Sequence, residues 1–181
     1  MSTQLPRPRV VVAADNAAGR SHIASDTLAQ PGRTVPERPG YSVTNVWALF
    51  EAPARIADPG RVAEYSGLAP PPSGNVLRII DYPPEPADPA DRKKMFDALF
   101  TKMFATGHER ASSSVHPGMH RTDSIDYVLV LAGEIYAVME EGETLLRAGD
   151  VLIQCGTVHA WSNRSSEMAR LAFVLIDGKR G

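Results

Sequence analysis

The chain has 181 residues, of which 43% are hydrophobic, and its formal net charge at pH 7 is −2. This length suits one domain, or one domain with a sizeable extension, and the hydrophobic content excludes a globally disordered chain. The balanced charge gives no reason to expect nucleic acid or an anionic membrane as a partner.

The expected location is the cytoplasm. The single cysteine, Cys155, cannot form an internal disulfide, which is the usual situation in a reducing compartment. No segment approaches the roughly 20 apolar residues that cross a bilayer. Residues 1–20 also lack the continuous apolar stretch of a signal peptide.

Proline and glycine recur through the first half of the chain and separate short apolar or β-branched runs. Three of these runs, at residues 9–14, 41–52 and 75–82, have the composition of strands. We therefore treat residues 1–108 as a strand-rich N-terminal extension that also contains one helix.

That helix is predicted at about residues 88–106. Asp88 can cap its first turn, Pro89 suits the first helical position, and Asp91 places a carboxylate where the helix dipole favours one. Gly107 would end the helix. We expect its apolar stripe to pack against the rest of the domain; a lid over a ligand cavity is an alternative compatible with that packing. The stripe contains Met95, Phe96, Leu99, Phe100, Met103 and Phe104.

The pattern from residue 109 to 181 is β throughout. Turn signals recur about every 8–12 residues, as a small antiparallel barrel or sandwich requires. The runs at residues 125–131 and 171–176 are nearly continuous in apolar side chains, so both faces of these strands should be covered. This favours a closed or double-sheet arrangement over an open sheet with one wet face.

Polar side chains interrupt the first of these runs and precede it. His120, Thr122 and Asp126 have the same parity and would point the same way in a regular strand. Tyr127 and Leu129, with Leu131, have the opposite parity and should pack outward against another layer. A carboxylate in the middle of a strand is costly to bury unless a metal ion or a cation compensates it. The alternative is that Asp126 is bonded to Arg121 or to turn amides.

A second polar group lies nearer the C-terminus, in the stretch "AGDVLIQCGTVHAWSN". Gly149 and Asp150 indicate a turn, residues 151–154 a strand, and His159 lies on the strand that follows. A single histidine in such a strand is most often a structural residue. Here, however, a barrel would bring this strand alongside the one that carries Asp126.

The spacing of these residues resembles the first of the two motifs of the cupin superfamily. His120 matches its first histidine, Asp126 takes its glutamate position, and Gly133 matches its closing glycine. Thr122 stands where the second histidine belongs, and Ser114 where the opening glycine belongs.

The second cupin motif is matched more fully. Gly149 opens it, and Gln154 stands in place of the proline with one residue fewer before it than in the motif. Gly156, His159 and Asn163 follow at the motif's spacing. The resemblance covers residues 114–163. It implies an all-β fold, a cupin-type jelly-roll β-barrel with its core at residues 109–181, on which the strand-rich extension and the covering helix pack. It also implies a homodimer.

The resemblance further implies a divalent transition metal, because cupins typically bind Fe, Mn, Ni or Zn through three histidines and a glutamate. The matched positions are His120, Asp126 and His159, and this set of two imidazoles and one carboxylate is similar to the facial triad of non-haem iron enzymes. His116 would join as a third imidazole if the "HPGMH" segment bends the backbone toward the others.

The stretch "HRTDSIDY", residues 120–127, resembles the signature of a subgroup of single-barrel cupins, some of which accompany aromatic polyketide pathways and are described as oxidoreductases. It implies a metal-dependent, dioxygenase-like oxidoreductase acting on a small organic substrate, aromatic or polyketide-like, inside the barrel. Two alternatives stay open: a non-redox cupin (decarboxylase, dehydratase or isomerase) and a non-catalytic barrel that binds a small molecule. The predicted substrate-binding residues are Thr122, Tyr136, Trp161 and Arg121.

Overall fold

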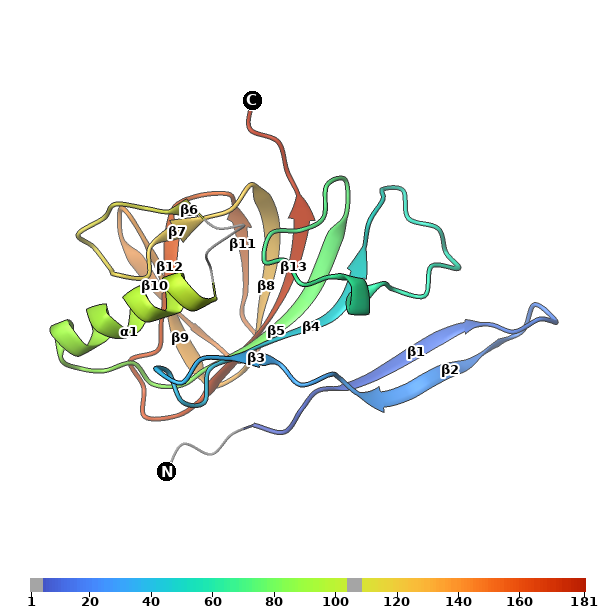
Figure 1. The fold of residues 1–181 in the computed structure, drawn as a ribbon, viewed down its shortest axis with the longest axis horizontal. Coiled ribbons are helices and arrows are strands. Elements are labelled where there is room, and N and C mark those ends of the chain that lie inside the picture. Colours follow the sequence, from blue (N-terminus) through green and yellow to red (C-terminus); the bar gives the residue numbers. More distant parts are fainter. Residues whose placement is uncertain (1–4, 104–108) are drawn as a thin grey trace.

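The computed structural model describes residues 5–103 and 109–181 and shows an all-β protein with one α-helix (Figure 1). No helix in these ranges is long and apolar enough to cross a membrane. The first strands are β1 (Arg9–Asp15), β2 (Ser21–Leu28), β3 (Arg33–Thr34), β4 (Ser42–Leu49) and β5 (Asn75–Tyr82), with a 3₁₀ turn, η1 (Val62–Glu64), between β4 and β5. After α1 (Pro89–Lys102) come β6 (Glu109–Arg110), β7 (His120–Arg121), β8 (Ser124–Ala132), β9 (Glu134–Met139), β10 (Glu143–Arg147), β11 (Val151–Cys155), β12 (His159–Ser162) and β13 (Ala169–Asp177).

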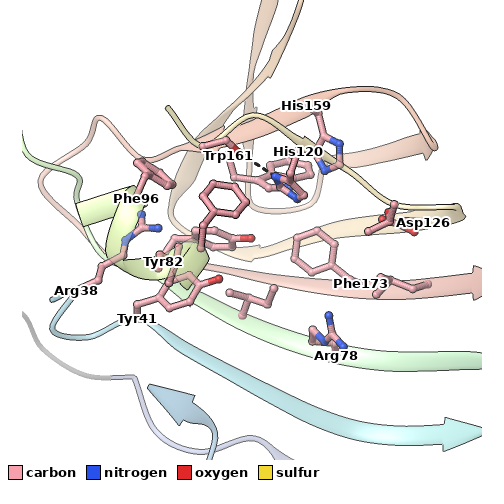
Figure 2. Close-up of a pocket in the computed structure, with 16 residues that line it drawn as sticks. Arg38, Tyr41, Arg78, Tyr82, Phe96, His120, Asp126, His159, Trp161 and Phe173 are labelled. Atoms are coloured by element: carbon pink, nitrogen blue, oxygen red, sulfur yellow. Dashed lines mark hydrogen bonds between the residues drawn. The ribbon is translucent and has the colours of Figure 1, made fainter. Parts of the chain in front are cut away.

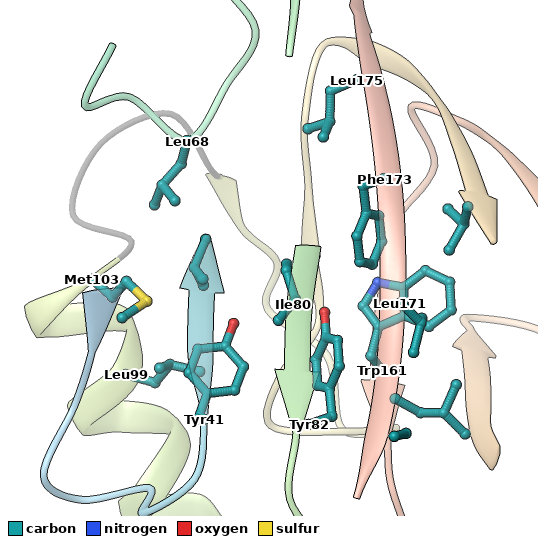
Figure 3. Packing of buried hydrophobic residues seen from close by; sticks show 14 of the residues in the cluster. Tyr41, Leu68, Ile80, Tyr82, Leu99, Met103, Trp161, Leu171, Phe173 and Leu175 are labelled. Carbon is teal, nitrogen blue, oxygen red and sulfur yellow. The ribbon is translucent and has the colours of Figure 1, made fainter. Parts of the chain in front are cut away.

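Two antiparallel sheets enclose the core. One has the strand order β11-β8-β13-β5-β4-β3 and the other β10-β9-β12-β7-β6. Buried side chains from both sheets meet in one large apolar cluster, with Leu171 and Phe173 on one sheet and Trp161 and Ala137 on the other. Figure 3 shows part of this cluster, including Tyr41 near Leu99, and Tyr82, Leu171 and Phe173. This is the double-sheet arrangement that the turn spacing predicted.

The N-terminal extension contributes directly to the barrel. β5 pairs with β13 over eight residue pairs, from Asn75 with Ile176 to Tyr82 with Ala169, and β4 continues the same sheet. β1 and β2 behave differently: they form a separate two-stranded sheet that projects from the barrel (Figure 1). Every residue of β2 is exposed.

The start of α1 is confirmed as predicted. The Asp88 carboxylate accepts hydrogen bonds from the backbone N–H groups of Ala90 and Asp91, both at 2.9 Å, with Pro89 at the first helical position. Four members of the predicted stripe are buried on one face, and Met103 follows them at the C-cap. Phe104 and Gly107 lie outside the described residues. The stripe therefore packs α1 onto the core.

The prediction that both faces of residues 125–131 are covered is wrong for the single chain. β8 alternates strictly between buried and exposed side chains, and its outward residues are between 37% and 48% exposed. Val151 and Ile153 of the neighbouring β11 are exposed on the same face. These outer-face residues are Ile125, Tyr127, Leu129, Leu131, Val151 and Ile153. Alternation with period 2 fixes their direction, and the described chain leaves all six exposed.

Candidate active site

Two histidines face each other across neighbouring strands. In the pairing of β7 with β12, His120 and His159 are directly opposite, and their ring centroids are 4.4 Å apart. Each Nδ1 lies 2.9 Å from the carbonyl oxygen of the residue two positions earlier, Gly118 or Thr157. Because a carbonyl oxygen can only accept, each Nδ1 carries the proton and each Nε2 carries the lone pair.

Burial keeps both rings neutral. Desolvation lowers the pKa of His120 below its ordinary value. The pKa of His159 falls to about 3, first because of burial and then because of the neighbouring His120. At pH 7 the pair therefore presents two neutral imidazoles.

Asp126 reaches the site from the other sheet. The shared parity of His120, Thr122 and Asp126 assumed a regular strand, but residues 122 and 123 cross from the five-stranded sheet to the six-stranded one. His120 and Asp126 still both face inward, because the two sheets face each other across the core. Thr122, on the crossing, is buried, and its hydroxyl lies 2.8 Å from the Ser124 hydroxyl.

The Asp126 carboxyl is buried without full compensation. The residue is 4% exposed, and its Oδ1 has no hydrogen-bond partner. Burial raises its pKa to about 6, although the Ser124 hydroxyl and the charge of Arg78 act in the opposite direction. The predicted alternative partner, Arg121, forms an ion pair with Glu109 instead, with Nε 2.7 Å from Oε2.

These groups line one cavity between the two sheets. Figure 2 shows Arg38 and Asp126 toward opposite ends of it, with Phe173 between them. Its walls are largely aromatic and aliphatic with a few polar groups, as is usual for small-molecule sites. The lining residues are Arg38, Tyr41, Arg78, Ile80, Tyr82, Phe96, Leu99, Phe100, Gly118, His120, Thr122, Asp126, His159, Trp161, Phe173 and Leu175.

The predicted substrate-binding residues divide into two groups. Thr122 and Trp161 line the cavity, and the Trp161 ring packs edge-on against His159 and Phe173. Tyr136 and Arg121 are not among the lining residues. Tyr136 lies one position away from the inward Ala137, so strand alternation turns it to the outer face of the sheet, where Arg164 packs over its ring. Arg121 follows the inward His120 and points away for the same reason.

His116 is buried but occupied elsewhere. Its Nε2 lies 3.3 Å from Oε2 of Glu85, and its Nδ1 accepts a hydrogen bond from the Gly118 N–H at 3.1 Å. The Phe96 ring packs edge-on against it, with the centroids 5.1 Å apart. The structure therefore does not bring His116 to the His120–His159 pair.

The donor set fits a metal ion only in part. Two neutral imidazoles, each held by an Nδ1–H bond to a carbonyl, are oriented as metal ligands commonly are. Across residues 5–103 and 109–181, however, no three His, Cys, Asp or Glu side chains come close enough together to hold an ion. Asp126 comes from the opposite sheet, and packed sheets lie about 10 Å apart, which is far for a side chain one methylene shorter than glutamate. In this arrangement the three predicted ligands do not form a centre.

Sequence reasoning missed two cavity arginines and two tyrosines of the extension. Arg78 on β5 and Arg38 in a turn are both 2% exposed, and Tyr41 and Tyr82 are buried beside them. The signal for Arg78 was an arginine inside the apolar run "NVLRIIDY". Arg38 lies in the proline-rich segment "VPERPGY", which no periodicity marks as inward.

The comparisons with known proteins agree with this fold. Phomopsin biosynthesis cluster protein C′ of Diaporthe leptostromiformis is 31% identical over 187 residues, which cover 98% of this chain and 82% of that protein. The cupin-domain-containing oxidoreductase virC of Hypocrea virens is 37% identical over 65 residues, 34% of either chain. This chain belongs to the cupin superfamily.

Among solved structures, the cupin-2 domain protein Rru_A2000 of Rhodospirillum rubrum aligns with all of this cupin and 78% of that chain. Its identity is 12% and the TM-score is 0.44. No family model matches the chain.

Proposed function

We propose that this cupin is an enzyme that converts a small organic molecule inside its barrel, and that Asp126 is the group that transfers a proton. One observation carries the proposal: a buried carboxyl with an unpartnered oxygen lines the same cavity as two neutral imidazoles. A carboxyl whose pKa is raised to about 6 can both take and return a proton near neutral pH.

The simplest chemistry for this set is an isomerisation. The Asp126 carboxylate takes a proton from a carbon next to a carbonyl group of the ligand and returns it to another atom of the same molecule. No other reagent is needed, because the ligand gives up a proton to Asp126 and takes it back, and keeps its electrons throughout. The imidazoles orient the ligand: a lone pair on Nε2 of His159 accepts a hydrogen bond from a ligand hydroxyl.

Deuterium exchange tests this proposal. The purified cupin is incubated in D₂O with a panel of aromatic and conjugated ketones, aldehydes and acids, and proton NMR follows loss of the C–H signals. Enzyme-dependent exchange is expected for at least one compound that binds, and Asp126→Asn should slow it by at least about 100-fold with unchanged affinity. The matched control is Asp123→Asn, which removes an exposed carboxylate from the same segment.

Two results would count against catalysis by Asp126. Exchange at the same rate in Asp126→Asn assigns the proton transfer to another group. Tight binding in the cavity without any exchange favours the non-catalytic barrel, which holds a ligand and leaves it unchanged.

A second candidate is a metal-dependent oxidoreductase. It is supported by the Nδ1–H anchoring of His120 and His159 and by relatives named as cupin-domain-containing oxidoreductases. The relatives named for the phomopsin cluster support a natural product as the substrate. A bound transition metal would supply a Lewis acid or a redox centre, and binding of one ion by His120, Asp126 and His159 stays a prediction.

Elemental analysis of protein purified without nickel resin tests this candidate. Close to one equivalent of Fe, Mn, Ni or Zn, lost in His120→Ala and in His159→Ala with the fold intact, would support it. Protein that stays metal-free after incubation with each ion would leave the proton-transfer proposal as the better account.

A further inference from the structure

A tight turn fixes the position of Arg38. The Arg38 N–H donates to the Val35 carbonyl oxygen at 3.2 Å, and the Tyr41 N–H donates to the Arg38 carbonyl oxygen at 3.0 Å. Gly40 has a φ of +88°, a backbone conformation that glycine adopts without strain. Glu37, next to Arg38, forms an ion pair with Lys102 of α1. The turn therefore holds Arg38 between the six-stranded sheet and the helix.

The Arg38 guanidinium is buried among aromatic rings. It is 2% exposed, and its central carbon lies 4.8 Å from the ring centroid of Tyr41, 5.3 Å from that of Phe96 and 5.6 Å from that of Tyr82. Its Nε and Nη2 have no hydrogen-bond partner, and no Asp or Glu in the described part of the chain forms an ion pair with it. Aromatic faces attract a cation but do not replace hydrogen-bond acceptors in the guanidinium plane.

The two unpartnered nitrogens form one edge of the guanidinium. Elsewhere in this chain the same edge binds both oxygens of a carboxylate. Arg170 uses Nε and Nη2 to hold Asp81 at 2.6 and 2.8 Å, and Arg9 holds Asp26 in the same way. In Arg78, the other cavity arginine, Nε donates to Oδ1 of Asn45 and Nη2 to the Gly67 carbonyl oxygen. Arg38 alone of the two cavity arginines has this edge without a protein acceptor.

We propose that Arg38 binds the carboxylate of the cavity ligand through its Nε and Nη2 atoms, so that the ligand is a monocarboxylic acid on a planar, conjugated or aromatic skeleton. This inference rests on the proposed function, since it names the molecule that the same cavity takes. A fork of two charge-assisted hydrogen bonds suits a carboxylate. The rings of Tyr41, Tyr82 and Phe96 suit a flat apolar body beside it.

The charges in the cavity favour one anionic group over several. Arg38 is the cavity arginine whose Nε and Nη2 lack acceptors, because Arg78 is already bonded and lies near Asp126. Glu85 is close enough to act on the charge of Arg38, but its carboxylate is paired with Arg92 and His116. The Asp126 carboxyl at the other end repels a second negative charge when it is ionised. A phosphate ester or a dicarboxylate would therefore leave charge uncompensated among apolar walls.

A purely structural role for Arg38 makes a different prediction. If Arg38 served only to hold the three rings together, its replacement by methionine would lower the melting temperature. If Nε and Nη2 of Arg38 instead bind a ligand, their burial without acceptors destabilises the ligand-free protein. Arg38→Met should then melt at the same temperature as the wild type or higher.

Calorimetric titration with trans-cinnamate and with the neutral trans-cinnamamide tests the inference. The wild type should bind cinnamate at least about tenfold more tightly than cinnamamide. Arg38→Met should weaken cinnamate binding by at least about tenfold and change cinnamamide binding by less than about threefold. Arg38→Lys keeps the positive charge but lacks the two-nitrogen fork, so its affinity for cinnamate should lie between those of the wild type and Arg38→Met. Arg20→Met removes one exposed positive charge and is the matched control.

The outcomes separate this inference from the proposed function. Equal affinity of the wild type for both compounds, or unchanged cinnamate binding by folded Arg38→Met, overturns the inference and leaves the cavity as a site for a neutral molecule. Failure of the wild type to bind either compound or any member of the deuterium-exchange panel overturns both. A lowered melting temperature in Arg38→Met together with unchanged binding assigns Arg38 a structural role.

Discussion

The two faces of β8 reverse the usual distribution of polar and apolar side chains. Toward the cavity the strand buries Ser124 and Asp126, each 4% exposed, ahead of Val128 and Val130. Toward the outside it exposes a stripe of four apolar or aromatic side chains. Burial of apolar surface alone would favour the opposite register. We propose that the cavity ligand accounts for the polar inner face and that a second copy of the chain covers the apolar outer face.

The largest effect expected on the cavity side concerns acid stability and His159. Its folded-state pKa of about 3 lies below the ordinary 6.5, so the unfolded chain takes up a proton that the folded chain refuses. Stability is present above pH 6.5 and is lost as the pH falls toward 3. Urea unfolding should show the wild type losing roughly 3 kcal/mol more than His159→Gln between pH 7.5 and 4.0. Parallel loss in both proteins would mean that His159 is not the neutral, buried group described.

Asp126 should have a smaller effect with the opposite sign. Its folded-state pKa of about 6 lies above the ordinary 3.8, so the folded chain binds the extra proton, and stability falls as the pH rises from about 4 through 6. Asp126→Asn should therefore be more stabilising at pH 7.5 than at pH 4.0, by roughly 2 kcal/mol. Infrared difference spectra against this variant should place the carboxyl titration near pH 6. A midpoint near 4 would falsify the uncompensated burial.

The smallest effect on monomer stability is expected on the outer face, where we propose that a second copy of the chain covers β8 and β11. Ile153 is 53% exposed and pairs with Tyr127 across the two strands. Ile153→Glu should change the unfolding free energy of the monomer by less than about 0.5 kcal/mol, yet convert a dimer to a monomer in light scattering after gel filtration. Ile153→Val is the control and should remain dimeric. A monomeric wild type would leave the stripe without this explanation.

Local patterns predicted several of the elements and the inward direction of His120 and Asp126. The structure confirms three predictions that depend only on neighbours along the chain: the cap at Asp88, the strand at residues 75–82 and the shared inward parity of His120 and Asp126. The crossing at residues 122–123 was missed because parity is the same for a continuous strand and for one that changes sheets. Arg38 was missed because a turn has no periodicity, so its burial depends on tertiary packing alone.

The two-residue crossing between β7 and β8 sets which side chains of β8 point into the barrel. One inserted residue there would invert β8, turning Asp126 toward solvent and the stripe of Ile125, Tyr127, Leu129 and Leu131 toward the cavity, unless a bulge absorbed it. Substitutions inside the cavity can change its chemistry gradually. A change in the length of this link would turn the polar face of β8 outward and its apolar face inward in a single step.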